Sequence, residues 1–266
     1  MRLVKILTDS LKLLFRRPKI YIPNLFASFL YTVFELVLIY YTLDLVYAVS
    51  MTSGYLSPGL IHDNMLPLIG LLLFYPFIGA IDLITYAMYP SMVSDYRSAG
   101  RVNLMSSLKN SLKSWRIILT FGLIIMFAFI LLFFIVLFFS VLSLLLDEVY
   151  MVYISLPVIL VYILVLMMAV FFLIPVGVIE EEGVYSSINK SLKLSIKHMR
   201  EVFFLESFFM ILVLSALSLG VLVNVGKINV GLTLTAVFLF IAVRLTQSVV
   251  YTYISVVNPY FYLERR

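Results

Sequence analysis

The sequence has no cysteine, only two histidines, and few charged residues, which make up 12% of its 266 positions. Without a thiol, the chain has no disulfide, no thiolate nucleophile and no cysteine-bound zinc. Its 11 glycines are scattered and form no phosphate-binding loop. We find no base and nucleophile in a catalytic pattern either. We therefore expect no enzymatic activity, no cofactor and no metal.

Hydrophobic residues are abundant, because they make up 63% of the chain, whereas soluble domains contain about 45–50%. A helix needs about 20 apolar residues to cross the hydrocarbon of a bilayer. Six runs reach this length, and they are Ile22–Val49, Leu66–Val93, Ile117–Leu146, Val149–Ile179, Val202–Val225 and Asn229–Leu263. The sequence therefore predicts an all-α polytopic membrane protein with six transmembrane helices. Pro76, Pro157 and Pro175 are candidate kink sites.

Positive charge is distributed unevenly between the ends of these runs. Apart from Lys227 and Arg244, every lysine and arginine lies in residues 1–21, 97–116 or 190–200, or at the C-terminus. All of these segments fall on one side of the membrane if the six runs cross it. By the positive-inside rule, that side is the cytoplasm. We therefore expect a multi-pass protein of the cell membrane with both termini inside.

Three of the basic segments share the tripeptide Ser-Leu-Lys, at Ser10, Ser111 and Ser191. In each segment, apolar residues recur at helical spacing opposite the positive charges. The expected apolar faces are Leu3, Leu7, Leu11 and Leu14; Met105, Leu108, Leu112 and Trp115; and Ile188, Leu192, Ile196 and Met199. Such helices lie flat at the bilayer surface, where they either anchor the spans or bind anionic headgroups. The candidate lipid contacts are Lys12, Arg16, Lys109, Lys113, Lys193 and Lys197.

A proline followed five positions later by an acid recurs near the end of every second run. The pairs are Pro90 and Asp95, Pro175 and Glu180, and Pro259 and Glu264. Together with the basic helices, they predict one transmembrane domain, 1–266, built from three units of about 1–96, 97–182 and 183–266. Each unit would contain an interfacial amphipathic helix and a transmembrane hairpin. Glu180–Glu182 are expected to form a solvated cap at the N-terminus of the third basic helix.

The segment Phe171–Leu205 resembles the signature of a prokaryotic, largely archaeal family of polytopic membrane proteins of unknown function. The resemblance is carried by an apolar span with Pro175, an acidic–glycine turn at Glu180–Gly183, and Lys-Ser-Leu-Lys at 190–193. That family is similar to the membrane domain of bacterial glycerophosphodiester phosphodiesterases. The resemblance implies the architecture alone, because in those enzymes the chemistry belongs to a separate soluble domain.

The apolar runs contain the charged residues Glu35, Asp44, Asp82 and Arg244, of which Asp44 lies nearer the outer surface. The candidate intramembrane polar site is Glu35, Asp82, Arg244 and Gln247. Charges inside the hydrocarbon are costly unless they pair or face water. With a rise of about 1.5 Å per residue, Glu35 and Arg244 lie at matching depths of about 20 Å. If three hairpins close into a ring, the first and last spans are neighbours. We then expect Arg244 to pair with Glu35, or alternatively with Asp82. The pair would act either as a latch between helices or as a polar site for an anion, a proton or a headgroup.

Two functions fit these features. The first is a non-enzymatic membrane scaffold, or a module that binds a partner or lipid. Its partners would be anionic headgroups or a protein at the basic cytoplasmic face, and the net charge of +5 would serve the membrane rather than nucleic acid. The second is a small-solute or ion transporter that uses Glu35, Asp82 and Arg244 in the bundle interior. We favour the first, because the three basic helices would present one continuous cytoplasmic surface. A third function, a membrane-embedded enzyme that acts on lipid, would need a catalytic set that the sequence does not supply.

Overall fold

The computed structural model describes residues 2–51, 59, 61–146, 150–225 and 234–266. Within these ranges every regular element is a helix. Six of the described helices are long and apolar enough to cross a membrane. This confirms the prediction of an all-α chain with the features of a multi-pass membrane protein.

The long helices follow the predicted apolar runs closely. They are α2 (Ile22–Met51), α4 (Leu66–Ala99), α6 (Trp115–Leu146), α7 (Tyr150–Val170), α10 (Met199–Val225) and α11 (Leu234–Arg265). Four shorter helices lie between or before them, and they are α1 (Arg2–Arg16), α5 (Leu104–Lys113), α8 (Leu173–Ile179) and α9 (Val184–Lys197). α1, α5 and α9 are the three segments that carry Ser-Leu-Lys, and each directly precedes a long helix or the short turn Pro18–Tyr21 that leads into one.

The fourth predicted span is not one continuous helix, because it breaks between α7 and α8 at Phe171 and Phe172. Pro175 is the physical reason. A proline has no N–H to donate to the carbonyl four residues earlier, so the Phe171 carbonyl has no helical donor. The Asn258 side chain donates to this carbonyl instead, at 2.8 Å. Ser191 Oγ in α9 donates to the nearby Ala169 carbonyl at 3.1 Å, so the break also provides a contact for the third Ser-Leu-Lys serine.

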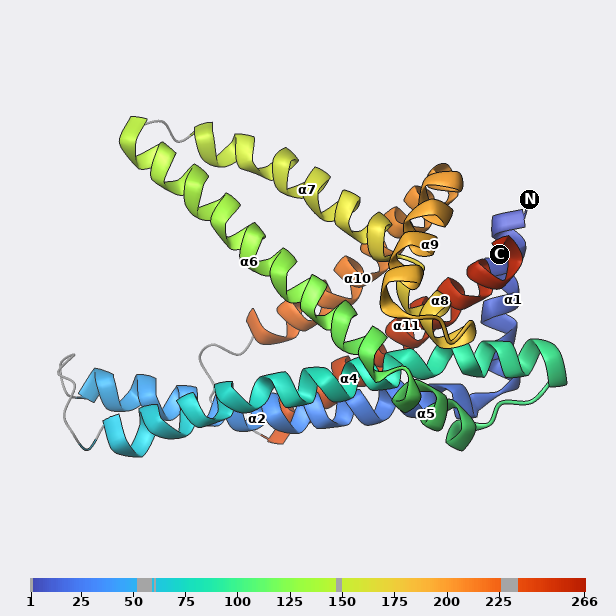
Figure 1. Cartoon of the computed structure of the whole chain (residues 1–266). Helices are drawn as coiled ribbons and strands as arrows, with labels where there is room; N and C mark the ends of the chain where they lie inside the picture. Colours follow the sequence, from blue (N-terminus) through green and yellow to red (C-terminus); the bar gives the residue numbers. More distant parts are fainter. Residues whose placement is uncertain (1, 52–58, 60, 147–149, 226–233) are drawn as a thin grey trace. The chain divides into compact units, whose positions relative to one another are not determined.

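The chain forms two compact units. The first contains Met1–Lys19, Ala87–Ile211 and Tyr253–Arg266, and the second contains Ile20–Tyr86 and Leu212–Thr252. In the first unit, α6 and α7 form a hairpin of two long helices (Figure 1). In the second unit, α2 and α4 lie side by side, and Tyr31 and Phe34 of α2 pack against Tyr75 of α4 (Figure 1).

Buried side chains are concentrated in three segments of the first unit. The segments are 87–93, 171–178 and 255–262, and each contains one of the three prolines that precede an acid. Phe171 and Phe172 pack against Phe209, Phe261 and Tyr262 at the centre of this core. Large apolar side chains along α6 are exposed, as expected where lipid, rather than water, surrounds a helix.

Candidate functional site

The predicted pair between Arg244 and Glu35 is present in the second unit. The Arg244 guanidinium forms an ion pair with the Glu35 carboxylate through Nη2, and its Nη1 donates to Gln247 Oε1 at 3.0 Å. Gln247 is buried and donates through Nε2 to the Ala216 carbonyl at 3.0 Å. The network joins α2, α11 and α10.

Asn24 of α2 provides a second contact with α11, because its amide donates to Thr252 Oγ1 at 3.2 Å. The two contacts confirm that the first and last spans are neighbours. Along α2 the contacts run from Asn24 to Glu35, and along α11 they run back from Thr252 to Arg244, so the two helices are antiparallel. Among the described residues, Asp82 forms no salt bridge with Arg244, and the alternative pairing is therefore wrong.

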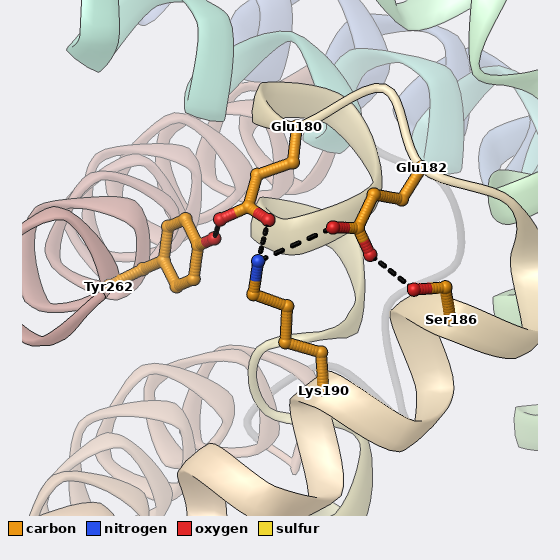
Figure 2. Close-up of polar contacts among 5 residues, drawn as sticks. All are labelled: Glu180, Glu182, Ser186, Lys190 and Tyr262. Carbon is orange, nitrogen blue, oxygen red and sulfur yellow. Dashed lines mark hydrogen bonds and ion pairs between the residues drawn. The ribbon is translucent and has the colours of Figure 1, made fainter.

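A second polar cluster lies in the first unit, where α8 turns into α9 (Figure 2). The Glu180 carboxylate accepts hydrogen bonds from the Lys190 ammonium and from the Tyr262 hydroxyl. Glu182 accepts from Ser186 Oγ, and its other oxygen lies 3.4 Å from Lys190 Nζ. The cluster therefore ties the α8–α9 turn to α9 and, through Tyr262, to the end of α11.

The burial of this cluster corrects the expected role of Glu180. The side chain of Glu180 is only 16% exposed, and Tyr262 is fully buried. Glu180 is therefore a partner inside the fold and not part of a solvated cap. The sequence could not indicate this, because Tyr262 is distant from Glu180 along the chain. Glu181 remains exposed, and its backbone has a φ of 51°, in the left-handed region.

The pKa shifts within the cluster favour a protonated Lys190 and an ionised Glu182 near neutral pH. The hydrogen bond to Glu180 is the main reason that the pKa of Lys190 is raised. The hydrogen bond from Ser186 is the main reason that the pKa of Glu182 is lowered, with further support from Lys190. Because both shifts favour the charged forms, this cluster is suited to hold helices together rather than to transfer a proton.

Two further ion pairs fix the end of α11 within the first unit. Arg265 pairs with Glu201 at the start of α10, and Arg97 pairs with Glu264 at 2.6 Å. His198 lies between α9 and α10, with Nδ1 3.6 Å from Glu201. Burial, followed by the nearby Arg265 charge, lowers the pKa of His198, although Glu201 acts in the opposite direction.

His198 therefore predicts a loss of stability in mild acid. Its pKa is lowered in the fold, so the unfolded chain binds more protons below the ordinary pKa of 6.5. The neutral imidazole makes its full contribution to the free energy of unfolding above this pH. The contribution decreases as the pH drops below 6.5, by at most about 1.4 kcal/mol per pH unit. Thermal unfolding in detergent between pH 7.5 and 5 measures this slope.

The histidine variants separate this effect from general acid sensitivity. His198→Gln should flatten the slope between pH 6.5 and 5. His62→Gln is the matched control, because the side chain of His62 is 80% exposed. An unchanged slope in His198→Gln would contradict the assignment.

The three basic helices have a common pattern of burial. Each helix has at least one buried serine, and in α1 it lies beside the buried apolar residues Ile6, Leu13 and Leu14. The buried serines are Ser10, Ser107, Ser111, Ser187, Ser191 and Ser195. The six predicted lipid contacts are all exposed, and they are Lys12, Arg16, Lys109, Lys113, Lys193 and Lys197. Large apolar side chains beside them are exposed too, and they include Leu11, Phe15, Leu112, Trp115, Leu192 and Ile196.

The predicted apolar face of α1 is wrong in part. Leu14 is buried together with Ile6 and Leu13, whereas Phe15 is 82% exposed. The helical pattern cannot distinguish an apolar side chain that packs on neighbouring helices from one that faces lipid. In α5 and α9 the distinction is clearer, because serines occupy the inward positions.

Sequence reasoning missed Glu206, which lies in α10 and is only 4% exposed. Its Oε2 atom has no hydrogen-bond partner among the described residues. A single acid within an apolar run is a signal that could have identified it. No group of three histidine, aspartate or glutamate side chains in the described ranges is placed to hold a metal ion.

Comparison of the chain with protein-family models, with curated proteins and with solved structures gives no match. The resemblance of Phe171–Leu205 to the archaeal family therefore stays a prediction. Function has to be argued from the chain's own geometry.

Proposed function

We propose that this protein is a non-enzymatic membrane scaffold whose basic helices bind anionic lipid headgroups at the cytoplasmic face. The six long helices would anchor it, with both termini inside. α1, α5 and α9 would then lie at the bilayer surface as parts of three related units. The observation that supports this proposal most is that each of these helices exposes apolar and basic side chains together, while at least one serine on it is buried.

This combination of exposed groups suits the boundary between hydrocarbon and headgroups. Phe15, Trp115 and Ile196 are 82%, 56% and 72% exposed, and burial of such side chains in the acyl region is favourable. Lysine side chains extend toward the headgroups while their stems remain in apolar surroundings. In water, these side chains would stay exposed and would contribute no favourable free energy of burial.

The alternative of a small-solute or ion transporter depends on Glu35, Asp82 and Arg244. The charge of Arg244 is already satisfied by Glu35 and Gln247, and Gln247 in turn donates to a backbone carbonyl. This closed network supports a latch between helices more than a site that exchanges ligands. We therefore retain the scaffold as the proposed function.

Quenching of tryptophan by brominated lipids tests the proposal one helix at a time. Trp115 is the only tryptophan, and as the first residue of α6 it reports on the junction with α5 without background. Trp115→Phe combined with Phe15→Trp or with Ile196→Trp moves the reporter to α1 or α9. We expect stronger quenching by brominated phosphatidylglycerol than by brominated phosphatidylcholine at all three positions.

Neutralising the lysines and arginine beside each reporter should weaken this preference. The pairs to change to glutamine are Lys12 and Arg16, Lys109 and Lys113, and Lys193 and Lys197. Each positive charge near an anionic surface contributes about 1 kcal/mol, or roughly fivefold in affinity. Lys227→Gln is the control, since sequence places it on the opposite side. Equal quenching by both lipids in the unmodified protein would refute the proposal.

A further inference from the structure

A cavity of about 500 Å³ lies in the first unit, between the α5–α6 connection and the α8–α9 turn. Its walls carry charges of opposite sign. Lys113 and Arg116 line it from the α5–α6 side, and Glu181 and Glu182 line it from the α8–α9 side. Its volume falls within the range of small-molecule sites, about 300–1,000 Å³.

The close approach of α8 to α6 holds these two walls together. Gly177 of α8 faces Ile117 of α6, and both residues line the cavity. A Cβ atom at position 177 would lie 2.5 Å from Ile117 Cγ2, which is far closer than ordinary contact. Only glycine allows this separation, because a larger residue at position 177 would push α8 away from α6.

Three of the four charges are not paired within the described part of the chain. Lys113, Arg116 and Glu181 form no salt bridge there, although the Arg116 guanidinium lies 5.6 Å from the centre of the Trp115 ring. Glu182 is different, because Ser186 and Lys190 already hold it. The cavity therefore offers two positive groups on one wall and one unpaired carboxylate on the other.

We propose that this cavity binds the headgroup of a phospholipid that carries both a phosphate and a primary amine, because Lys113 and Arg116 face Glu181 across it. Lysine and arginine donate charge-assisted hydrogen bonds to phosphate oxygens. A carboxylate accepts N–H bonds from a primary ammonium. A headgroup without an amine would leave Glu181 beside the phosphate, and a quaternary amine has no N–H to donate.

The assignment to a lipid rests on the proposed function, which places α5 and α9 at the bilayer surface. Leu119 and Leu123 continue from the cavity along α6, and they are 56% and 42% exposed. They provide an apolar surface for the acyl chains of a lipid whose headgroup occupies the cavity. A soluble phosphate with an amine would share the headgroup chemistry but would not use this surface.

Native mass spectrometry of the detergent-solubilised protein tests the inference by measuring the affinity of each lipid-binding event. The probes are phosphatidylethanolamine, phosphatidylcholine and phosphatidylglycerol with identical acyl chains, so that only the group beyond the phosphate differs. We expect the first molecule of phosphatidylethanolamine to bind about tenfold more tightly than phosphatidylcholine, as one charge-assisted hydrogen bond allows.

Variants assign this preference to the two walls. Glu181→Gln should reduce the affinity for phosphatidylethanolamine to that for phosphatidylcholine. Glu181→Gly should do the same, and glycine tolerates the positive φ at this position, so the fold is retained. The double variant Lys113→Gln with Arg116→Gln should lower the affinity for all three lipids. Arg101→Gln is the control, because Arg101 is exposed, lies before α5 and does not line the cavity.

Three outcomes would overturn the inference. They are the absence of a preference for phosphatidylethanolamine, a preference that survives both Glu181 variants, and displacement of the lipid by soluble phosphoethanolamine at equal concentration. Anionic-lipid selectivity at the α1 and α9 reporters is independent of this cavity. If this selectivity is observed but the preference for phosphatidylethanolamine is not, only the headgroup site is refuted. If the selectivity itself is absent, the proposed function is refuted.

Discussion

Replacing Arg244 with leucine is expected to lower the free energy of unfolding by about 3–5 kcal/mol, because Glu35 would lose its ion-pair partner within an apolar run. Gln247 would also lose the donor to its carbonyl oxygen. Unfolding by sodium dodecyl sulfate in mixed micelles, followed by circular dichroism, measures the change. The loss is large because few groups inside a membrane span can replace the guanidinium.

The double variant Glu35→Leu with Arg244→Leu distinguishes a latch from a site. If the pair only joins α2 to α11, two apolar side chains of similar volume should recover most of the stability. Arg101→Leu is the control, since Arg101 is exposed and lies outside the spans. Arg244→Leu with unchanged stability would contradict the latch.

Replacing Glu180 with leucine is expected to cost about 2–4 kcal/mol. The change removes the acceptor of a buried tyrosine hydroxyl and the partner of Lys190 at once. The expected consequence is a looser junction between α8, α9 and the end of α11. The same unfolding titration detects it.

Two comparisons sharpen this second prediction. Tyr262→Phe in the Glu180→Leu background should recover part of the loss, because no buried hydroxyl is left without an acceptor. Glu181→Gln is the neighbouring control, and it should change stability by no more than about 0.5 kcal/mol, since Glu181 is exposed. Equal losses of stability at positions 180 and 181 would show that the Glu180 cluster does not contribute the expected free energy of unfolding.

The ion pair between the first and last spans was predictable from sequence for a simple reason. Charges within apolar runs are rare and costly, so few partners compete for each. Matching depth then sufficed to pair Arg244 with Glu35. The Glu180–Tyr262 contact was not predictable in this way, because tyrosines near the ends of spans are common and most are interfacial anchors.

The sequence by itself determined the class of the protein, the six long apolar helices with most of their bounds, and the positions of its exposed lysines. These follow from local composition, since each helix satisfies its own backbone and the bilayer requires a fixed length of apolar chain. Only the tertiary structure decided where the fourth span breaks, which face of α1 is buried, and that Gly177 and Ile117 line a cavity with both signs of charge. These features depend on side chains from distant segments, such as Asn258 at the Phe171 carbonyl, and no local pattern records such contacts.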